Sequence, residues 1–262
     1  MQRTMKRFYK KEYYQRIKYD FNLRYPYLRV LAKTLVNKFS PVSALDIGCA
    51  KGYLVYALRE LGVDAYGVDV SKYAIFESPH KVKGCLLNLD VDFEDLPFNH
   101  DVFDLVTALE VVEHLRETDH LISEMKRVLK KGGISLISTP PSKLRDLLVG
   151  MMIGDGYGIL GHNPTHVNLH SRSFWIRKFK QYGFQFVGDF PKDALKSAIA
   201  SYPPSGKIAE FLVRFGRTGK RIRDELALIL TNPTLLFRLT NKTSAPACTR
   251  GLPRNLEGNR VR

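Results

Sequence analysis

The stretch LDIGCAKG, from Leu45 to Gly52, decides the fold. An apolar run that begins at Ser43 leads into a turn of small residues, and Leu54, Ala57 and Leu58 then follow at helical spacing. Small residues let the backbone of such a turn approach a ligand closely, and the start of the helix points its N–H groups at negative charge. The segment therefore predicts a buried strand, a ligand-binding turn and a helix; a plain strand–helix connection is the alternative.

The same alternation of strands and helices continues along the chain. Helices are expected from Thr118 to the glycine pair at 132–133, and from Ser171 to Tyr182. Further strands are expected at 65–70, 85–89, 103–108, 134–138, 184–187 and 234–239. This alternation is typical of an α/β fold with parallel βαβ units, in which ligands bind beyond the carboxyl ends of the strands.

Asp69 ends the second predicted strand, 21 residues after Gly48. An acidic residue about 20 residues beyond such a turn is placed to accept hydrogen bonds from ribose hydroxyls. Taken alone, Asp69 could equally be a charge at a helix N-terminus. Together with Gly48 and Gly52 it indicates a site for an adenosine-type ligand.

Five motifs then occur in order: LDIGCAKG, GVDVS at 67–71, DFEDLPF at 92–98, FDLVTALEVVEHL at 103–115 and MKRVLKKGGISLISTP at 125–140. Together they resemble the class I S-adenosylmethionine (SAM)-dependent methyltransferases, of the small-molecule type similar to the ubiquinone-biosynthesis methyltransferases. The resemblance covers residues 41–190. It implies SAM as the cofactor and a Rossmann-like, seven-stranded, mostly parallel sheet with helices on both faces and an antiparallel last strand.

The resemblance also implies cofactor-binding roles for nine residues at or beyond the strand ends: Asp46, Gly48, Cys49, Gly52, Asp69, Val70, Asp92, Phe93 and Leu109. The turn would surround the methionine moiety, with Asp46 at its amino group. Asp69 would take the ribose hydroxyls and Asp92 the adenine amino group. The sequence departs from the family pattern at Ala50, where the family usually has glycine.

Methylation of a hydroxyl requires a base that takes its proton. The candidate catalytic residues are Glu110 and His114, after the fourth predicted strand, and His166 in the segment NPTHVNLHS. A structural role is the alternative for the histidines, and no metal is predicted. A different interpretation adds Glu113 to these three residues as a set of metal ligands, because the ExxEH spacing resembles the small-RNA 3′-terminal 2′-O-methyltransferases.

The net charge of +15 is placed unevenly. Residues 1–40 carry 11 Lys and Arg against 2 acidic residues, and residues 192–262 carry 14 against 5, whereas residues 41–191 carry 16 against 19. The two basic ends could be a lid and solvated surface, or could bind an anionic membrane surface or nucleic acid. Because the charge lies outside the motifs, it concerns partners rather than chemistry.

The predicted organisation has three parts. Residues 1–40 form a basic, aromatic helical arm, and residues 241–262 form a disordered basic tail. Residues 41–240 form the methyltransferase domain, with lid insertions at 140–170 and 192–231, the second of them helical. Three widely separated cysteines and the lack of a long apolar run argue against a disulfide framework and a membrane span.

The sequence thus predicts a SAM-dependent methyltransferase that acts on a small-molecule, lipid-linked or saccharide-linked acceptor, at oxygen. A metal-dependent RNA 2′-O-methyltransferase and a catalytically silent SAM-fold binding module are the alternatives. The N-terminal residues lack the apolar core of a signal peptide, so the expected location is the cytoplasm, with membrane association through the basic ends left open.

Overall fold

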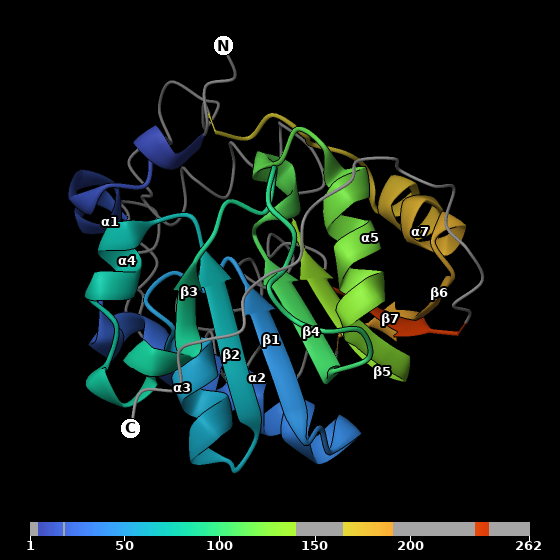
Figure 1. Ribbon diagram of the computed structural model, residues 1–262, viewed down its shortest axis with the longest axis horizontal. Coiled ribbons are helices and arrows are strands. Elements are labelled where there is room, and N and C mark those ends of the chain that lie inside the picture. The colour runs from blue at the N-terminus through green and yellow to red at the C-terminus, as the bar shows by residue number, and fades with distance from the viewer. Residues whose placement is uncertain (1–4, 18, 140–164, 191–233, 241–262) are drawn as a thin grey trace, which may run out of the picture.

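A computed structural model describes residues 5–17, 19–139, 165–190 and 234–240 (Figure 1). Seven strands form one sheet in the order β3-β2-β1-β4-β5-β7-β6. Neighbouring strands from β3 to β5 pair in parallel, and β7 runs antiparallel to both β5 and β6. The strands are β1 (Ser43–Ile47), β2 (Asp64–Asp69), β3 (Leu86–Asn88), β4 (Phe103–Leu109), β5 (Leu129–Ser138), β6 (Phe184–Asp189) and β7 (Thr234–Leu239). The predicted fold class and the antiparallel last strand are confirmed.

Helices cover both faces of the sheet (Figure 1). They are α1 (Lys11–Arg16), α2 (Phe21–Phe39), α3 (Tyr53–Glu60), α4 (Lys72–Phe76), α5 (Thr118–Val128) and α7 (Arg172–Gln181), with short 3-10 turns η1 (Met5–Arg7), η2 (His80–Cys85) and η3 (Val112–His114). Side chains alternate between the faces of a strand. Ala44 and Leu136 accordingly join the core under α2 and α3, whereas Leu45 and Ile137 join the core under α5 and α7.

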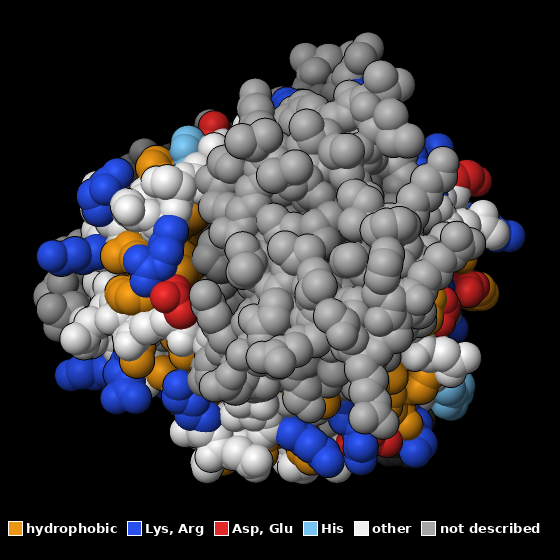
Figure 2. All heavy atoms as spheres, turned by 180° about the vertical axis from the view of Figure 1, so that it is seen from behind, with side chains coloured by type: hydrophobic (Ala, Val, Ile, Leu, Met, Phe, Trp, Pro, Cys, Tyr) orange, Lys and Arg blue, Asp and Glu red, His pale blue; other side chains and the backbone are white. Residues whose placement is uncertain are grey.

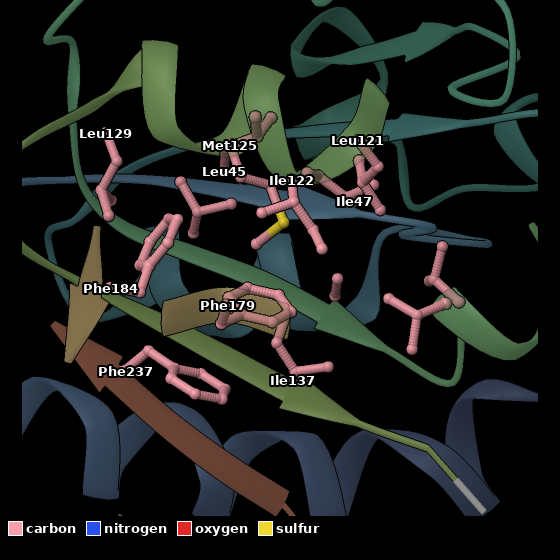
Figure 3. Close-up of a cluster of buried hydrophobic side chains, with 14 of the residues drawn as sticks. Leu45, Ile47, Leu121, Ile122, Met125, Leu129, Ile137, Phe179, Phe184 and Phe237 are labelled. Atoms are coloured by element: carbon pink, nitrogen blue, oxygen red, sulfur yellow. The ribbon is translucent and has the colours of Figure 1, made fainter. Parts of the chain in front are cut away.

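The core under α5 and α7 is rich in aromatic side chains (Figure 3). Phe179 of α7 is fully buried, and its ring stacks on Phe237 of β7 with the centroids 4.5 Å apart. Burying a side chain of this size contributes about 1.5–3 kcal/mol. The packing therefore fixes α7 on the antiparallel edge of the sheet.

Helix α5 ends earlier than the sequence predicts. The glycine pair at 132–133 suggests a helix that continues to that point, but the helix stops at Val128 and β5 begins at Leu129. Leu129 already pairs with Phe103 of β4, and the register then shifts before the next pair. Gly132, with φ of +81°, lies within this irregular part of the strand. Strand pairing thus overrides the local helical pattern.

Helix α2 lies inside the stretch predicted as the N-terminal arm. Its Leu31, Ala32 and Leu35 are buried in the core, and Asp20 caps its start by accepting a hydrogen bond from the backbone N–H of Leu23 at 3.0 Å. The division into an arm, a domain and a tail stays a prediction. Most of the first predicted lid, all of the second and the tail lie outside the described residues.

Lys and Arg side chains are spread around the described part of the face shown in Figure 2, mixed with apolar and acidic ones. No helix within the described ranges is long and apolar enough to cross a bilayer.

Candidate active site

The strand order reverses between β1 and β4, and the turn after β1 leads into α3 at this point. Gly48 and Gly52 adopt φ values of +72° and +70°, which side-chain-bearing residues rarely adopt. A Cβ on Gly48 would lie 2.3 Å from the side chain of Val111, and one on Gly52 would lie 2.5 Å from that of Leu86. The turn therefore forms a tight backbone cradle at the carboxyl end of the sheet.

Ala50 lies in the middle of this turn with φ of +48°. This conformation costs a residue with a Cβ about 1–2 kcal/mol. The departure from the family's glycine is thus accommodated with the glycine-like backbone kept. The N–H of Ala50 donates a 2.7 Å hydrogen bond to Asp69 Oδ2.

Asp69, at the end of β2, is buried against the turn. Its other carboxyl oxygen accepts a 2.7 Å hydrogen bond from the N–H of Ser71. Burial raises the pKa of Asp69 to about 6, although the two backbone hydrogen bonds lower it. Asp69 thus holds the turn and the start of α4 together while it carries a charge that is costly to bury.

Asp46, in β1, is the second buried carboxyl group beside the turn. It pairs with Thr107 of β4 in the sheet and accepts a 2.6 Å hydrogen bond from the Thr107 hydroxyl. Burial raises the pKa of Asp46 to about 7, and the hydroxyl bond only partly offsets this effect. A bound cation would favour the charged form of this carboxyl group.

The other predicted cofactor residues lie around these two carboxyl groups in different environments. Asp92 is buried, and its carboxylate accepts hydrogen bonds from the backbone N–H groups of residues 116 and 117, just before α5. Phe93 is 39% exposed, and Val70 and Leu109 are half-buried. The side chain of Cys49 is buried in the core under α2 and α3, so it can contribute to a ligand site through its backbone alone.

Tyrosines of the N-terminal segment pack against the start of α4, beside Asp69. The carbonyl of Tyr9 accepts a 2.6 Å hydrogen bond from the hydroxyl of Ser71, and Tyr14 is 5% exposed with its ring 5.7 Å from that of Tyr73. Burial, with the nearby charge of Asp69, raises the pKa of Tyr14 well above its usual range. An open cavity of about 340 Å³ lies beside these residues; its lining includes Tyr14, Tyr19, Lys51 and Tyr73.

Glu110 follows β4 and opens the other half of the site. Its φ of +56° is unusual for a side-chain-bearing residue, and its N–H donates to the carbonyl of Ser138 at 3.0 Å. The hydroxyl of Ser138 in turn donates to Glu110 Oε1 at 2.5 Å. The end of β5 therefore fixes both the backbone and the carboxylate of Glu110.

His114 and His166, 52 residues apart in sequence, lie side by side. Their ring centroids are 4.8 Å apart, and His114 Nδ1 lies 3.0 Å from the carbonyl oxygen of Thr165. The N–H groups of Val167 and Asn168 donate to the carbonyl of Glu113 at 2.9 and 3.0 Å. The segment 165–168 is thus bonded to η3, and two of the predicted catalytic residues meet there.

Glu113 is fully buried behind the two histidines. Burial, followed by the charge of the nearby Glu110, raises its pKa well above the usual range of a glutamate. The carboxyl group is therefore held in a site where it can be stable only when protonated or when paired with a cation.

Several site residues could not be identified from motifs. Thr107 could have been found from the expected pairing of β1 with β4, which places it beside Asp46. Ser138 lies at the end of a predicted strand, where ligands bind in such sheets. The positions of Tyr9, Tyr14 and Thr165 have no sequence signal beyond the general richness of the first 40 residues in tyrosine.

Comparisons with known proteins agree with this architecture. A family model described as a methyltransferase domain matches residues 19–188. The ubiquinone biosynthesis O-methyltransferase of Pelagibacter ubique is 31% identical over 113 residues, 42% of this chain and 47% of that protein. The enzyme of the same name from Rickettsia typhi is 26% identical over 166 residues, 62% of this chain and 65% of that protein.

A solved structure of geranyl diphosphate C-methyltransferase from Streptomyces coelicolor shares the fold. The similarity has a TM-score of 0.50 at 16% sequence identity and covers 79% of this chain and 77% of that one. The chain matches about half to two thirds of the length of the two curated relatives. The family model spans most of the described sheet, and the chain therefore belongs to the class I SAM-dependent methyltransferase family.

Proposed function

We propose that the chain binds SAM at the carboxyl ends of β1 and β2 and transfers its methyl group to an acceptor hydroxyl. The observation that carries this proposal is the pair of buried carboxyl groups, Asp46 and Asp69, on either side of a glycine turn at the point where the strand order reverses. Ligands of open α/β sheets bind at this point. The fit is supported by the turn itself, since Gly48 and Gly52 leave no room for a Cβ.

The buried carboxyl groups suit the charges and hydroxyls of this cofactor. An ammonium group beside Asp46 would offset the burial that raises the pKa of this residue to about 7. Each oxygen of Asp69 accepts one backbone N–H and keeps a further lone pair for a ribose hydroxyl. We assign the adenine end to Asp92, Phe93 and Val70, as the resemblance implies.

When bound, the cofactor supplies a methyl group on a sulfonium, so that the protein needs only to orient the acceptor and remove its proton. Glu110, His114 and His166 are the residues that we assign to this task. The carbonyl of Thr165 can only accept a hydrogen bond, so the contact at 3.0 Å places the proton of neutral His114 on Nδ1 and leaves Nε2 as the basic nitrogen.

We propose one type of reaction, methylation at oxygen, but several chemical classes of acceptor. The names of the curated relatives favour oxygen as the methylated atom. We propose a small-molecule, lipid-linked or saccharide-linked acceptor. Contact of the basic ends with an anionic membrane surface stays a prediction, because residues 191–233 and 241–262 lie outside the described part of the chain.

Calorimetry with SAM and with its demethylated product tests cofactor binding. Labelled SAM, incubated with the protein and with extracts separated into lipid, saccharide, RNA and protein fractions, then tests the acceptor class. We expect binding of both ligands and label in the lipid or saccharide fraction. A wild-type protein that binds neither ligand would refute the proposal, and label confined to RNA would favour an RNA 2′-O-methyltransferase.

A further inference from the structure

Helix α5 is bonded along its length to the loop between β3 and β4. This loop carries Asp92 and Phe93, two of the residues that we assign to the adenine end of the cofactor. Three side chains of α5 contact its backbone: His120, Glu124 and Arg127. Residues at positions i, i+4 and i+7 lie on one face of a helix. One face of α5 therefore follows the loop from end to end.

Glu124 and Arg127 make most of these bonds. Glu124 Oε2 accepts a 2.7 Å hydrogen bond from the backbone N–H of Leu96. The guanidinium group of Arg127 donates to the carbonyls of Leu96 and Phe98 at 2.8 and 2.6 Å. It also donates to the two carboxylate oxygens of Glu124, at 2.8 and 2.6 Å. The pair therefore binds both the N–H and the carbonyl of Leu96, and each partner holds the other in place.

The pair is largely shielded from water. The side chains of Arg127 and Glu124 are 22% and 11% exposed. Although burial raises the pKa of Glu124, the hydrogen bonds and charge of Arg127 outweigh this effect and hold the pKa below its usual range. Two parallel bonds between an arginine and a carboxylate fix the geometry of both groups as well as binding them strongly. The carbonyls that Arg127 binds are thus held by a rigid group.

The first part of the loop is bonded to the residues just before the same helix. Asp92 Oδ1 accepts hydrogen bonds from the backbone N–H groups of residues 116 and 117, at 3.1 and 3.2 Å. Both bonds use the same oxygen, so that Oδ2 keeps its lone pairs for a ligand. The loop is therefore bonded to the region of α5 at Asp92 and again at residues 96–98, and the position of Asp92 depends on both attachments.

We propose that Glu124 and Arg127 are positioning residues of the cofactor site, which act through the loop to hold Asp92 and Phe93 at the adenine ring. This inference rests on the proposed binding of SAM. A hydrogen bond from the adenine amino group to Asp92 weakens steeply when its length or angle departs from the usual range. The pair should therefore set the affinity for the cofactor and also the preference for adenine over a purine without the amino group.

Two ligands measure this preference by calorimetry on the full chain. They are S-adenosylhomocysteine, the demethylated product of SAM, and S-inosylhomocysteine, in which an oxygen replaces the adenine amino group. The wild type should bind the first about tenfold more tightly, because the second cannot donate that hydrogen bond to Asp92.

The variant that tests the pair combines Glu124→Gln with Arg127→Met. It removes both charges together, so that no buried charge is left unpaired and the chain should fold. We expect its affinity for S-adenosylhomocysteine to fall about tenfold and its affinity for S-inosylhomocysteine to change little, so that the preference is lost. Arg127→Lys keeps the charge but not the planar fork that reaches both carbonyls, and it should show a smaller loss of the same kind.

Lys178→Met is the matched control. Lys178 of α7 forms an ion pair with Asp119 of α5, and its side chain is 18% exposed, close to the exposure of Arg127. The substitution therefore removes a similarly shielded cation from the same helix, but on the side of α7 rather than at the loop. Both the affinity and the preference for adenine should stay as in the wild type.

Hydrogen exchange of the backbone, followed by mass spectrometry without any ligand, gives a second measurement. Residues 92–98 should exchange faster in the double variant than in the wild type and in Lys178→Met, because the loop has lost its attachment to α5. Unchanged exchange in the double variant would show that the pair does not hold the loop, and would refute the positioning role.

The outcomes separate the positioning role from the proposed function. A wild type that binds neither ligand refutes both. A wild type that prefers S-adenosylhomocysteine, with a double variant of the same affinity and preference, refutes the positioning role alone. Equal losses for the two ligands in the double variant also refute it, because a general loss of stability does not distinguish adenine from its deaminated form. A wild type that binds the two ligands equally refutes the adenine role of Asp92, and the positioning role with it.

Discussion

Ala50 offers a direct test of the cofactor turn. With φ of +48°, its backbone lies in a region that glycine adopts freely, so Ala50→Gly should remove about 1–2 kcal/mol of strain. Glycine also gives the unfolded chain more freedom, which costs about 0.5–1 kcal/mol. The two effects leave a net gain of about 1 kcal/mol in the free energy of unfolding.

Ala57 is the matched control, because it lies in helix α3 just after the same turn and is fully buried. Ala57→Gly should lower the free energy of unfolding by about 1 kcal/mol from helix propensity and by a similar amount from the lost methyl group. Urea unfolding measures both variants, and a stability change of 1 kcal/mol corresponds to a midpoint shift of about 0.3–1 M. If Ala50→Gly destabilises the protein as Ala57→Gly does, the left-handed turn is wrong.

Three further predictions concern the buried carboxyl groups and the cover over them. Asp69→Ala should weaken SAM binding by about 1–3 kcal/mol in calorimetry. The control is Asp64→Ala, in an exposed ion pair at the other end of β2, which should leave SAM binding unchanged. Equal effects of the two substitutions would contradict the role assigned to Asp69. Burial raises the pKa of Asp46 to about 7, so the folded protein retains a proton that the unfolded chain loses near pH 4. This group should therefore make the ligand-free protein less stable as the pH rises from about 4 to 7. Asp46→Asn should flatten this part of the pH profile of urea unfolding, and an unchanged slope would argue against it. Ser71→Ala should cost about 1 kcal/mol in the same measurement, since the Ser71 hydroxyl caps α4 and also binds the carbonyl of Tyr9; no loss would mean that neither bond matters in solution.

The strands could be predicted from the sequence because each carries a short apolar run bounded by a turn. The predicted strand at 103–108, for example, differs from β4 only in its last residue. The end of α5 could not be predicted, because pairing of Leu129 with Phe103 depends on a strand 26 residues earlier in the chain. A local pattern indicates which residues are buried, but it does not indicate where pairing with a distant strand replaces a helix.

The cofactor half of the site could also be predicted in outline. Asp46, Gly48 and Asp69 lie at strand ends within two successive βα units, so their meeting follows from the sheet order. Their hydrogen bonds could not be predicted. The bond from the N–H of Ala50 to Asp69 depends on the left-handed conformation of Ala50, a position that the sequence shows only as a departure from the family pattern.

The acceptor half depends on a contact that no motif encodes. His166 lies beyond a stretch outside the described residues, and backbone hydrogen bonds from 167 and 168 to Glu113 bring it to His114. Because backbone groups are the same in every residue, such a contact leaves no mark on the sequence. The meeting of His114 and His166 could therefore be found only in the three-dimensional arrangement.

Tyr9 connects the two halves of the site. Its carbonyl accepts the hydroxyl of Ser71, beside Asp69, while its ring lies edge-on to His114 with the centroids 5.8 Å apart. One residue of the N-terminal segment thus touches both Ser71, next to the cofactor carboxylate Asp69, and His114, which we assign to the acceptor. Methyl transfer needs the two ligands in line and shielded from water. A segment that packs on both halves at once meets this need, because its placement depends on the two halves being formed together.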